Sequence, residues 1–146
     1  MKRLAAVVAS TCMLAPAAAA AAAYYPHPWV TKQLGNSCSV TAMGIERVVT
    51  TPNHFELSFG GGTSCAGAVG NKNLVVELQI KVPHKGWSPE ATIRRSNFRG
   101  NPLRLVSSIN IAGSGASHQY RIAATATDTR HGVTRTGTVF SKVLTA

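Results

Sequence analysis

Acidic side chains are scarce in this chain. The 146-residue sequence has five of them against 15 lysines and arginines. Glycoside cleavage usually takes two carboxyl groups across the scissile bond, and no pair among the five acids has a spacing that indicates an acid and a base. The acids are Glu46, Glu56, Glu77, Glu90 and Asp128. The positive charge instead favours anionic partners, through a long-range attraction that salt weakens.

Other catalytic signatures are also missing. The strings at 35–39 and 62–66 come nearest to Gly-x-Ser-x-Gly, but they lack the final glycine and a following helix. The histidines occur singly near turns or strand ends, without metal-ligand spacing. They are His27, His54, His84, His118 and His131. The sequence therefore predicts no catalytic residue, metal or cofactor, and it favours a non-enzymatic protein. A hydrolase whose histidine site assembles only in the folded chain remains an alternative.

No segment carries an apolar stripe of helical period. Residues 54–59 and 74–82 instead alternate apolar and polar side chains, with Leu74, Val76 and Leu78 on one face of the clearer strand. Further strands are expected within 39–50, 91–96, 103–111, 118–127 and 133–143. About seven short strands separated by turn formers predict an all-β, single-domain antiparallel β-sandwich, immunoglobulin-like, with a small β-barrel as the alternative.

Two turn assignments accompany this prediction. The glycine run 60–62 is expected to end the strand that begins at His54, and residues 85–89, which include Trp87, are expected to form a turn. Residues 128–135 are expected to form a hairpin with its turn at His131 and Gly132.

The N-terminus has the layout of a secretory signal. Lys2 and Arg3 precede an apolar stretch, and Pro16 is followed by seven alanines. A membrane span needs roughly 20 apolar residues, and the strongly apolar part here is shorter, so no stable span is expected after cleavage. The predicted organisation is a cleaved signal at 1–23, an N-terminal arm at 24–37 and a sandwich domain at 38–146, with a secreted, extracellular location.

Only three cysteines are present, and Cys12 leaves with the signal. Cys38 and Cys65 then remain in a chain bound for an oxidising compartment, where we expect them to form a disulfide. The competing interpretation, a catalytic thiol beside a histidine, would need reducing conditions. Cleavage also removes two cations, so the mature chain has a net charge of +8.

The uneven feature of the mature chain is a cluster of arginines, Arg94, Arg95, Arg99 and Arg104. The planar guanidinium suits phosphate and carboxylate groups, so these four are the candidate anion-binding residues. If the segment is a strand, a loop and a strand, Arg94 and Arg95 point to opposite faces and the set converges only in part. The competing interpretation is a set of solvated strand faces on a basic protein.

The overall layout resembles the small secreted β-rich proteins that actinobacteria encode in large numbers. The likeness rests on the alanine-rich signal, a strand that opens with cysteine, the Lys85-Gly86-Trp87 segment and the late run at 118–127. It implies secretion and a β fold and carries over no catalytic residue. The sequence thus favours binding of an extracellular anionic surface, such as a cell-wall polymer; the alternatives are the hydrolase and an inhibitor or toxin that acts on another extracellular protein. Intracellular nucleic acid conflicts with export.

Overall fold

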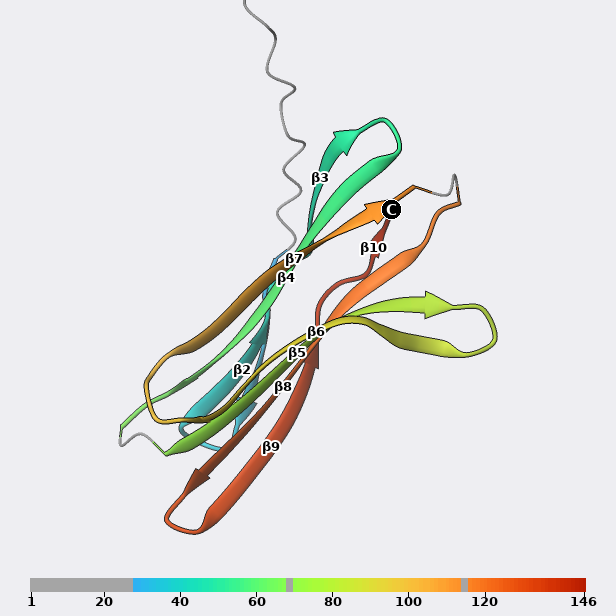
Figure 1. Cartoon of the computed structure of the whole chain (residues 1–146). Helices are drawn as coiled ribbons and strands as arrows, with labels where there is room; N and C mark the ends of the chain where they lie inside the picture. The colour runs from blue at the N-terminus through green and yellow to red at the C-terminus, as the bar shows by residue number, and fades with distance from the viewer. Residues whose placement is uncertain (1–27, 68–69, 114–115) are drawn as a thin grey trace, which may run out of the picture.

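The fold is all-β, with two antiparallel sheets packed face to face as a β-sandwich (Figure 1). The computed structural model describes residues 28–67, 70–113 and 116–146, which form ten strands. The signal peptide expected at 1–23 lies outside the described residues. Within the described ranges, no helix is long and apolar enough to cross a membrane.

The first sheet is built around the long strand β4. Its strands are β1 (Val30–Leu34), β2 (Cys38–Ala42), β3 (Glu46–Thr51), β4 (His54–Cys65) and β7 (Leu103–Ala112). β2 and β3 both pair with β4, β2 along its second half and β3 along its first half, while β7 pairs along nearly its whole length. β1 extends the sheet beyond β2.

The second sheet has β8 and β5 at its centre. Its strands are β5 (Asn71–Val82), β6 (Gly86–Phe98), β8 (Gln119–Arg130), β9 (Val133–Phe140) and β10 (Leu144–Thr145). β9 and β10 pair with successive parts of β8, and β6 forms the opposite edge beside β5. The hairpins β3–β4 and β5–β6 diverge at one end of the molecule (Figure 1).

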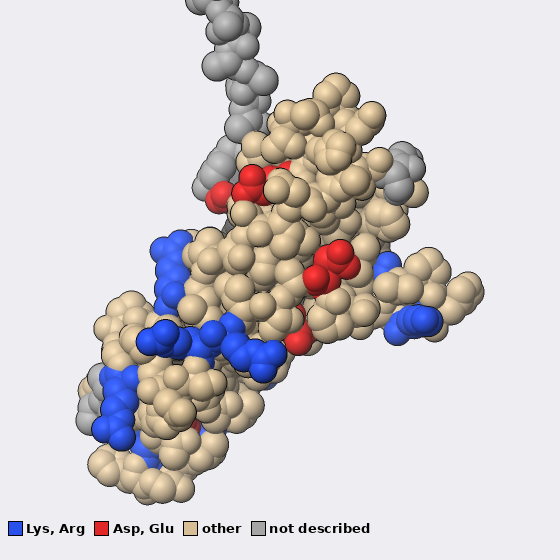
Figure 2. Space-filling view, viewed as in Figure 1, with Lys and Arg blue, Asp and Glu red and all other residues tan. Residues whose placement is uncertain are grey.

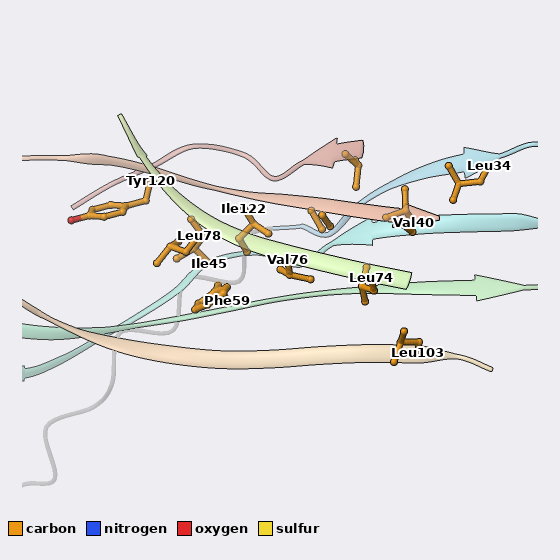
Figure 3. Close-up of a cluster of buried hydrophobic side chains, with 14 of the residues drawn as sticks. Leu34, Val40, Ile45, Phe59, Leu74, Val76, Leu78, Leu103, Tyr120 and Ile122 are labelled. Atoms are coloured by element: carbon orange, nitrogen blue, oxygen red, sulfur yellow. The ribbon is translucent and has the colours of Figure 1, made fainter. Parts of the chain in front are cut away.

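The core lies between the sheets and follows the alternation of the strands. Leu74, Val76 and Leu78 of β5 are completely buried, as their spacing predicts, and Phe55, Leu57 and Phe59 of β4 are buried as well. Figure 3 shows Val76, Ile122 and Phe59 in the layer between the two sheets. Removing this apolar area from water is the main favourable term in folding.

The described residues form ten strands and not about seven, and the difference arises from tertiary contacts. The expected run 39–50 is split into β2 and β3 by Met43–Ile45, and the chain stays beside β4 because the Met43 amide donates to the Gly60 carbonyl oxygen (3.0 Å). The expected run 133–143 is likewise split into β9 and β10. Segment 24–37, expected to be an arm, contains β1, which has no apolar alternation and depends on its pairing with β2.

The two turn assignments at 60–62 and 85–89 are wrong. The three glycines lie inside β4, where Gly61 faces the core and replaces a side chain that the narrow space between the sheets would not accept. The turn before β6 is at 83–85, with His84 at a φ of 62°, so Trp87 lies in a strand. At 60–62, tight packing between the sheets requires glycine within a strand. At 85–89, the turn starts two residues earlier than the sequence pattern indicates.

The β8–β9 hairpin confirms the turn expected at His131 and Gly132. Both residues have positive φ, 47° and 76°, as a two-residue type I′ turn requires. On the outer face of this hairpin, three cross-strand threonine pairs are joined by hydroxyl hydrogen bonds of 2.8 to 2.9 Å. The pairs are Thr125 with Thr138, Thr127 with Thr136 and Thr129 with Thr134.

Candidate functional site

Basic side chains gather over one half of the molecule. Figure 2 shows most of the visible lysines and arginines toward the end where β6 turns into β7, and most of the visible acids in the other half. Arg94 and Arg95 lie on β6, Arg99 lies in the connection, and Arg104 lies on β7. All four are exposed. In the described part of the chain the one ion pair joins Arg130 and Asp128, so these four guanidinium groups have no carboxylate partner there.

The four arginines are spread over both sheets. Arg94 lies opposite Val75, on the outer face of the second sheet, whereas Arg95 lies opposite the buried Leu74 and points the other way at the open edge. Arg104 lies opposite Gly62 in the first sheet. The expected divergence of Arg94 and Arg95 is therefore observed, and the cluster forms a basic edge that spans both sheets.

A groove on the outer face of the first sheet takes in one of these arginines. It is a hollow of about 240 Å³ with backbone of Gly61 and Gly62 at its floor. Trp29 lines this hollow, and 56% of its surface is exposed. The Arg104 guanidinium carbon lies 4.9 Å from the centroid of the Trp29 ring. Because the glycines have no side chains, a flat partner could approach the strand closely.

This groove continues along β4. A second hollow of about 160 Å³ shares Met43 and Arg104 with the first and is lined by Gly60 and the exposed Val106. We refer to the two hollows together as the glycine groove. Sequence reasoning missed it because Trp29 stands in a segment without periodicity, and only the pairing of β1 with β2 brings Trp29 to β4. The glycine run was the available signal, since glycines within a strand often mark close backbone approach.

An aromatic stack covers the outer face of the second sheet. The Arg121 guanidinium carbon lies 4.4 Å from the Trp87 ring centroid and 4.1 Å from that of Phe140. Arg121 Nε also donates to Gln79 Oε1 (2.9 Å). Burial lowers the pKa of Arg121. Because its guanidinium contacts rings on β6 and β9 and a side chain on β5, this arginine links β8 to three other strands and is engaged within the protein.

The histidines form no acid–base pair in the described ranges. His131 and Asp128 line a common hollow of about 310 Å³, but no hydrogen bond joins them, and Asp128 Oδ2 lies 2.9 Å from Arg130 Nε. Nucleophilic or general-base chemistry needs the two groups within hydrogen-bond reach. His54 contacts Thr51, with its Nδ1 3.1 Å from the hydroxyl oxygen, and His118 packs edge-on against Tyr120.

The predicted disulfide is present. Cys38 opens β2 and Cys65 ends β4, the two lie directly opposite in the sheet, and their Cα atoms are 4.0 Å apart. A bridge between neighbouring strands is compatible with an extracellular protein. The described residues contain one group with possible metal ligands, Cys38, Cys65 and Asp128. Its two sulfurs are bonded to each other, which leaves only the carboxylate.

Sequence reasoning also missed a buried polar cluster beside this bridge. Lys72 is completely buried on β5, and Asp128 is 4% exposed on the neighbouring β8. Lys72 occupies the inward-facing position before Leu74 on β5, and Asp128 occupies the inward-facing position after Ala126 on β8. Extending the period of two beyond the apolar residues would have placed both inside the sandwich.

Comparison of the chain with known protein families and with curated proteins found no match. The basic edge and the glycine groove are therefore the features of the molecule that bear on its function.

Proposed function

We propose that this protein is a secreted binding protein whose basic edge and glycine groove hold an extracellular anionic polymer. The observation that carries the proposal is a set of four exposed guanidinium groups without a carboxylate partner in the described chain. Unpaired arginines can form bidentate hydrogen bonds to phosphate or carboxylate groups. A polymer with repeated charges suits them, because they are spread along an edge and do not converge on one point.

The glycine groove gives the polymer a second kind of contact. Trp29 offers an exposed ring, and Arg104 beside it offers a cation, so a polymer unit could pack against the ring while its acidic group pairs with the arginine. An exposed aromatic next to a glycine floor supports binding of a flat ring or a sugar unit more than binding of a folded protein. The inhibitor or toxin alternative has no comparable observation in its favour.

Charge reversal at Arg95 and Arg99 tests the basic edge. The double variant Arg95→Glu/Arg99→Glu is expected to leave a heparin column at clearly lower salt than the native protein. The slope of log affinity against log salt should fall by about two, one for each cation lost. The measurement is salt-gradient elution, followed by titration calorimetry with heparin at several salt concentrations.

The matched control is Lys81→Glu/Lys85→Glu. It changes the net charge by the same amount at exposed positions near the tip of the β5–β6 hairpin, away from the basic edge. We expect the control to elute close to the native protein. Equal loss of retention in both variants would show that only net charge matters, and retention insensitive to salt would rule out the electrostatic proposal.

Substitution of Trp29 tests the groove separately. Trp29→Ala should weaken binding of the same polymer by roughly 2- to 10-fold through loss of ring contacts, while leaving the salt slope nearly unchanged. Trp29→Phe should restore much of the affinity, because an aromatic face is retained. Unchanged affinity in Trp29→Ala, with Arg95→Glu/Arg99→Glu impaired, would confine the site to the basic edge.

A further inference from the structure

A lysine is buried inside the sandwich without an ion pair. Lys72 is 0% exposed, and its Nζ donates to the Gly100 carbonyl oxygen (2.8 Å) and to Asn101 Oδ1 (3.0 Å). The described residues provide no carboxylate within ion-pair distance of this amine. An ammonium group removed from water is costly unless its charge is compensated. Loss of a proton to give the neutral amine is therefore easier for Lys72 than for a lysine at the surface.

The side-chain amide of Asn101 is held in place against this amine. Its Oδ1 accepts from the Cys65 amide (3.0 Å) as well as from Lys72, and its Nδ2 donates to the Cys65 carbonyl oxygen (2.7 Å). Both donors polarise the amide carbonyl, and the Cys65 amide stays in place to stabilise the negative charge that develops on Oδ1 when Lys72 attacks. The carbon bonded to Oδ1 is thus an activated electrophile beside a buried amine.

Asp128 supplies a carboxylate on the next strand. It lies directly opposite Lys72 in the β5–β8 register and is 4% exposed. Its Oδ2 faces Arg130, whereas its Oδ1 is buried and has no hydrogen-bond partner among the described residues. Buried polar atoms are rarely left unpaired. The Asp128 carboxylate lies beyond ion-pair distance of Nζ but acts on its charge, so a proton passes between the two groups through one intervening water or after a side-chain movement.

We propose that Lys72 and Asn101 are joined by an intramolecular isopeptide bond, which forms with Asp128 as the proton carrier. The buried amine is the nucleophile, the side-chain amide carbon of Asn101 is the electrophile, and ammonia is the leaving group. No oxidant, reductant or further reactant is required. The proposal does not depend on polymer binding.

The protons and electrons balance as follows. Asp128 takes a proton from the Lys72 ammonium, and the neutral Nζ attacks Cγ of Asn101 with its lone pair while the carbonyl π electrons move to Oδ1. Asp128 then gives its proton to Nδ2 and takes one from Nζ. The Cγ–Nδ2 bond breaks, ammonia leaves with the bonding pair, and the carbonyl reforms. The ammonia recovers the proton from Asp128 as ammonium.

The charges around Lys72 agree with this sequence of steps. Burial lowers the pKa of Lys72, the Asp128 carboxylate opposes this, and Arg130 adds to the lowering. Arg130 itself contacts Asp128 and donates from Nη1 to the Ala66 carbonyl oxygen (3.1 Å). The bond would link β5 to the β6–β7 connection, beside the disulfide that links β2 to β4.

The test is the intact mass of the folded, exported protein. We expect a mass lower by one ammonia than the sequence with one disulfide requires. Protease digestion should release a branched peptide in which the segment around Lys72 is attached to the segment around Asn101. The full mass together with unlinked peptides, in protein that is folded by circular dichroism, would overturn the proposal.

Variants separate the roles of the three residues. Lys72→Arg and Asn101→Ala should both show the full mass expected for their sequences. Asp128→Asn should show its full mass, without loss of ammonia, in most molecules. Lys81→Arg, on an exposed part of the same strand, is the matched control and should lose ammonia like the native chain. Loss of ammonia in Lys72→Arg would assign the mass change to another reaction. The native mass decides the question even if a variant fails to fold.

Discussion

Replacing both Cys38 and Cys65 with alanine is expected to lower the free energy of unfolding by about 3 to 4 kcal/mol. The bridge joins residues 27 positions apart, and a closed loop of this length restricts the unfolded chain by an amount of that order in the chain-entropy model. This is a large share of the stability of a small domain. Urea unfolding followed by fluorescence measures the change as a shift in midpoint.

The neighbouring pair in the same register provides the control. Ser39 lies opposite Ser64, one position along from the disulfide. Ser39→Ala/Ser64→Ala alters two cross-strand side chains without removing a covalent link, so we expect a change of only a few tenths of a kcal/mol, within the range of surface substitutions. If the cysteine double variant proved as stable as the oxidised native protein, the bridge would not contribute to folding.

Gly61→Val is expected to cost about 1 to 3 kcal/mol, and more if the sheets cannot move apart. A Cβ atom at this position would lie 2.9 Å from the Thr41 carbonyl oxygen, 2.9 Å from Val76 Cγ2 and 3.0 Å from Ala124 Cβ. Backbone and side chains of both sheets would have to shift, which is the situation in which overpacking destabilises. Thermal unfolding followed by circular dichroism measures the effect.

Gly62→Ala is the matched control for this prediction. The next glycine points to the opposite face, where a Cβ would meet only the Leu103 carbonyl oxygen, at 3.1 Å, and the Arg104 Cα, at 4.0 Å. We expect a much smaller loss of stability, together with a narrower glycine groove. Equal stability of Gly61→Val and the native protein would mean that the space between the sheets is wider than the structure has it.

Local patterns were sufficient for the fold class and for much of the core. The alternation through Leu74, Val76 and Leu78 identifies a strand and its buried face, because only one face of a sheet in a sandwich meets the other sheet. The cysteine pairing followed from the loss of Cys12 with the predicted signal. The turn at His131 and Gly132 followed from local turn chemistry.

Most of the missed features depend on contacts between distant segments. β1 has no apolar period of its own, and Trp29 reaches the glycine groove only because β1 pairs with β2. Asn101 meets Lys72 across 29 positions of sequence. The glycines of β4 resemble a turn locally, and their role becomes visible only when the opposite sheet is present. Such contacts are set by strand register, which composition does not specify.

The arginine cluster illustrates the same division. Its exposure and the divergence of Arg94 from Arg95 followed from strand geometry, whereas the stacking of Arg104 on Trp29 needed the pairing of β7 with β4. The four residues stay the candidate anion-binding set, and their role is a proposal that the charge-reversal experiment addresses.

The threonine pairs on the β8–β9 hairpin give this surface a different response to its surroundings. Their hydroxyls satisfy one another across the strands and carry no charge. Ionic strength and pH therefore have little effect on these hydroxyl hydrogen bonds, whereas the same changes in medium act directly on the basic edge. Under the proposed binding function, added salt should release the anionic polymer and leave these threonine pairs intact.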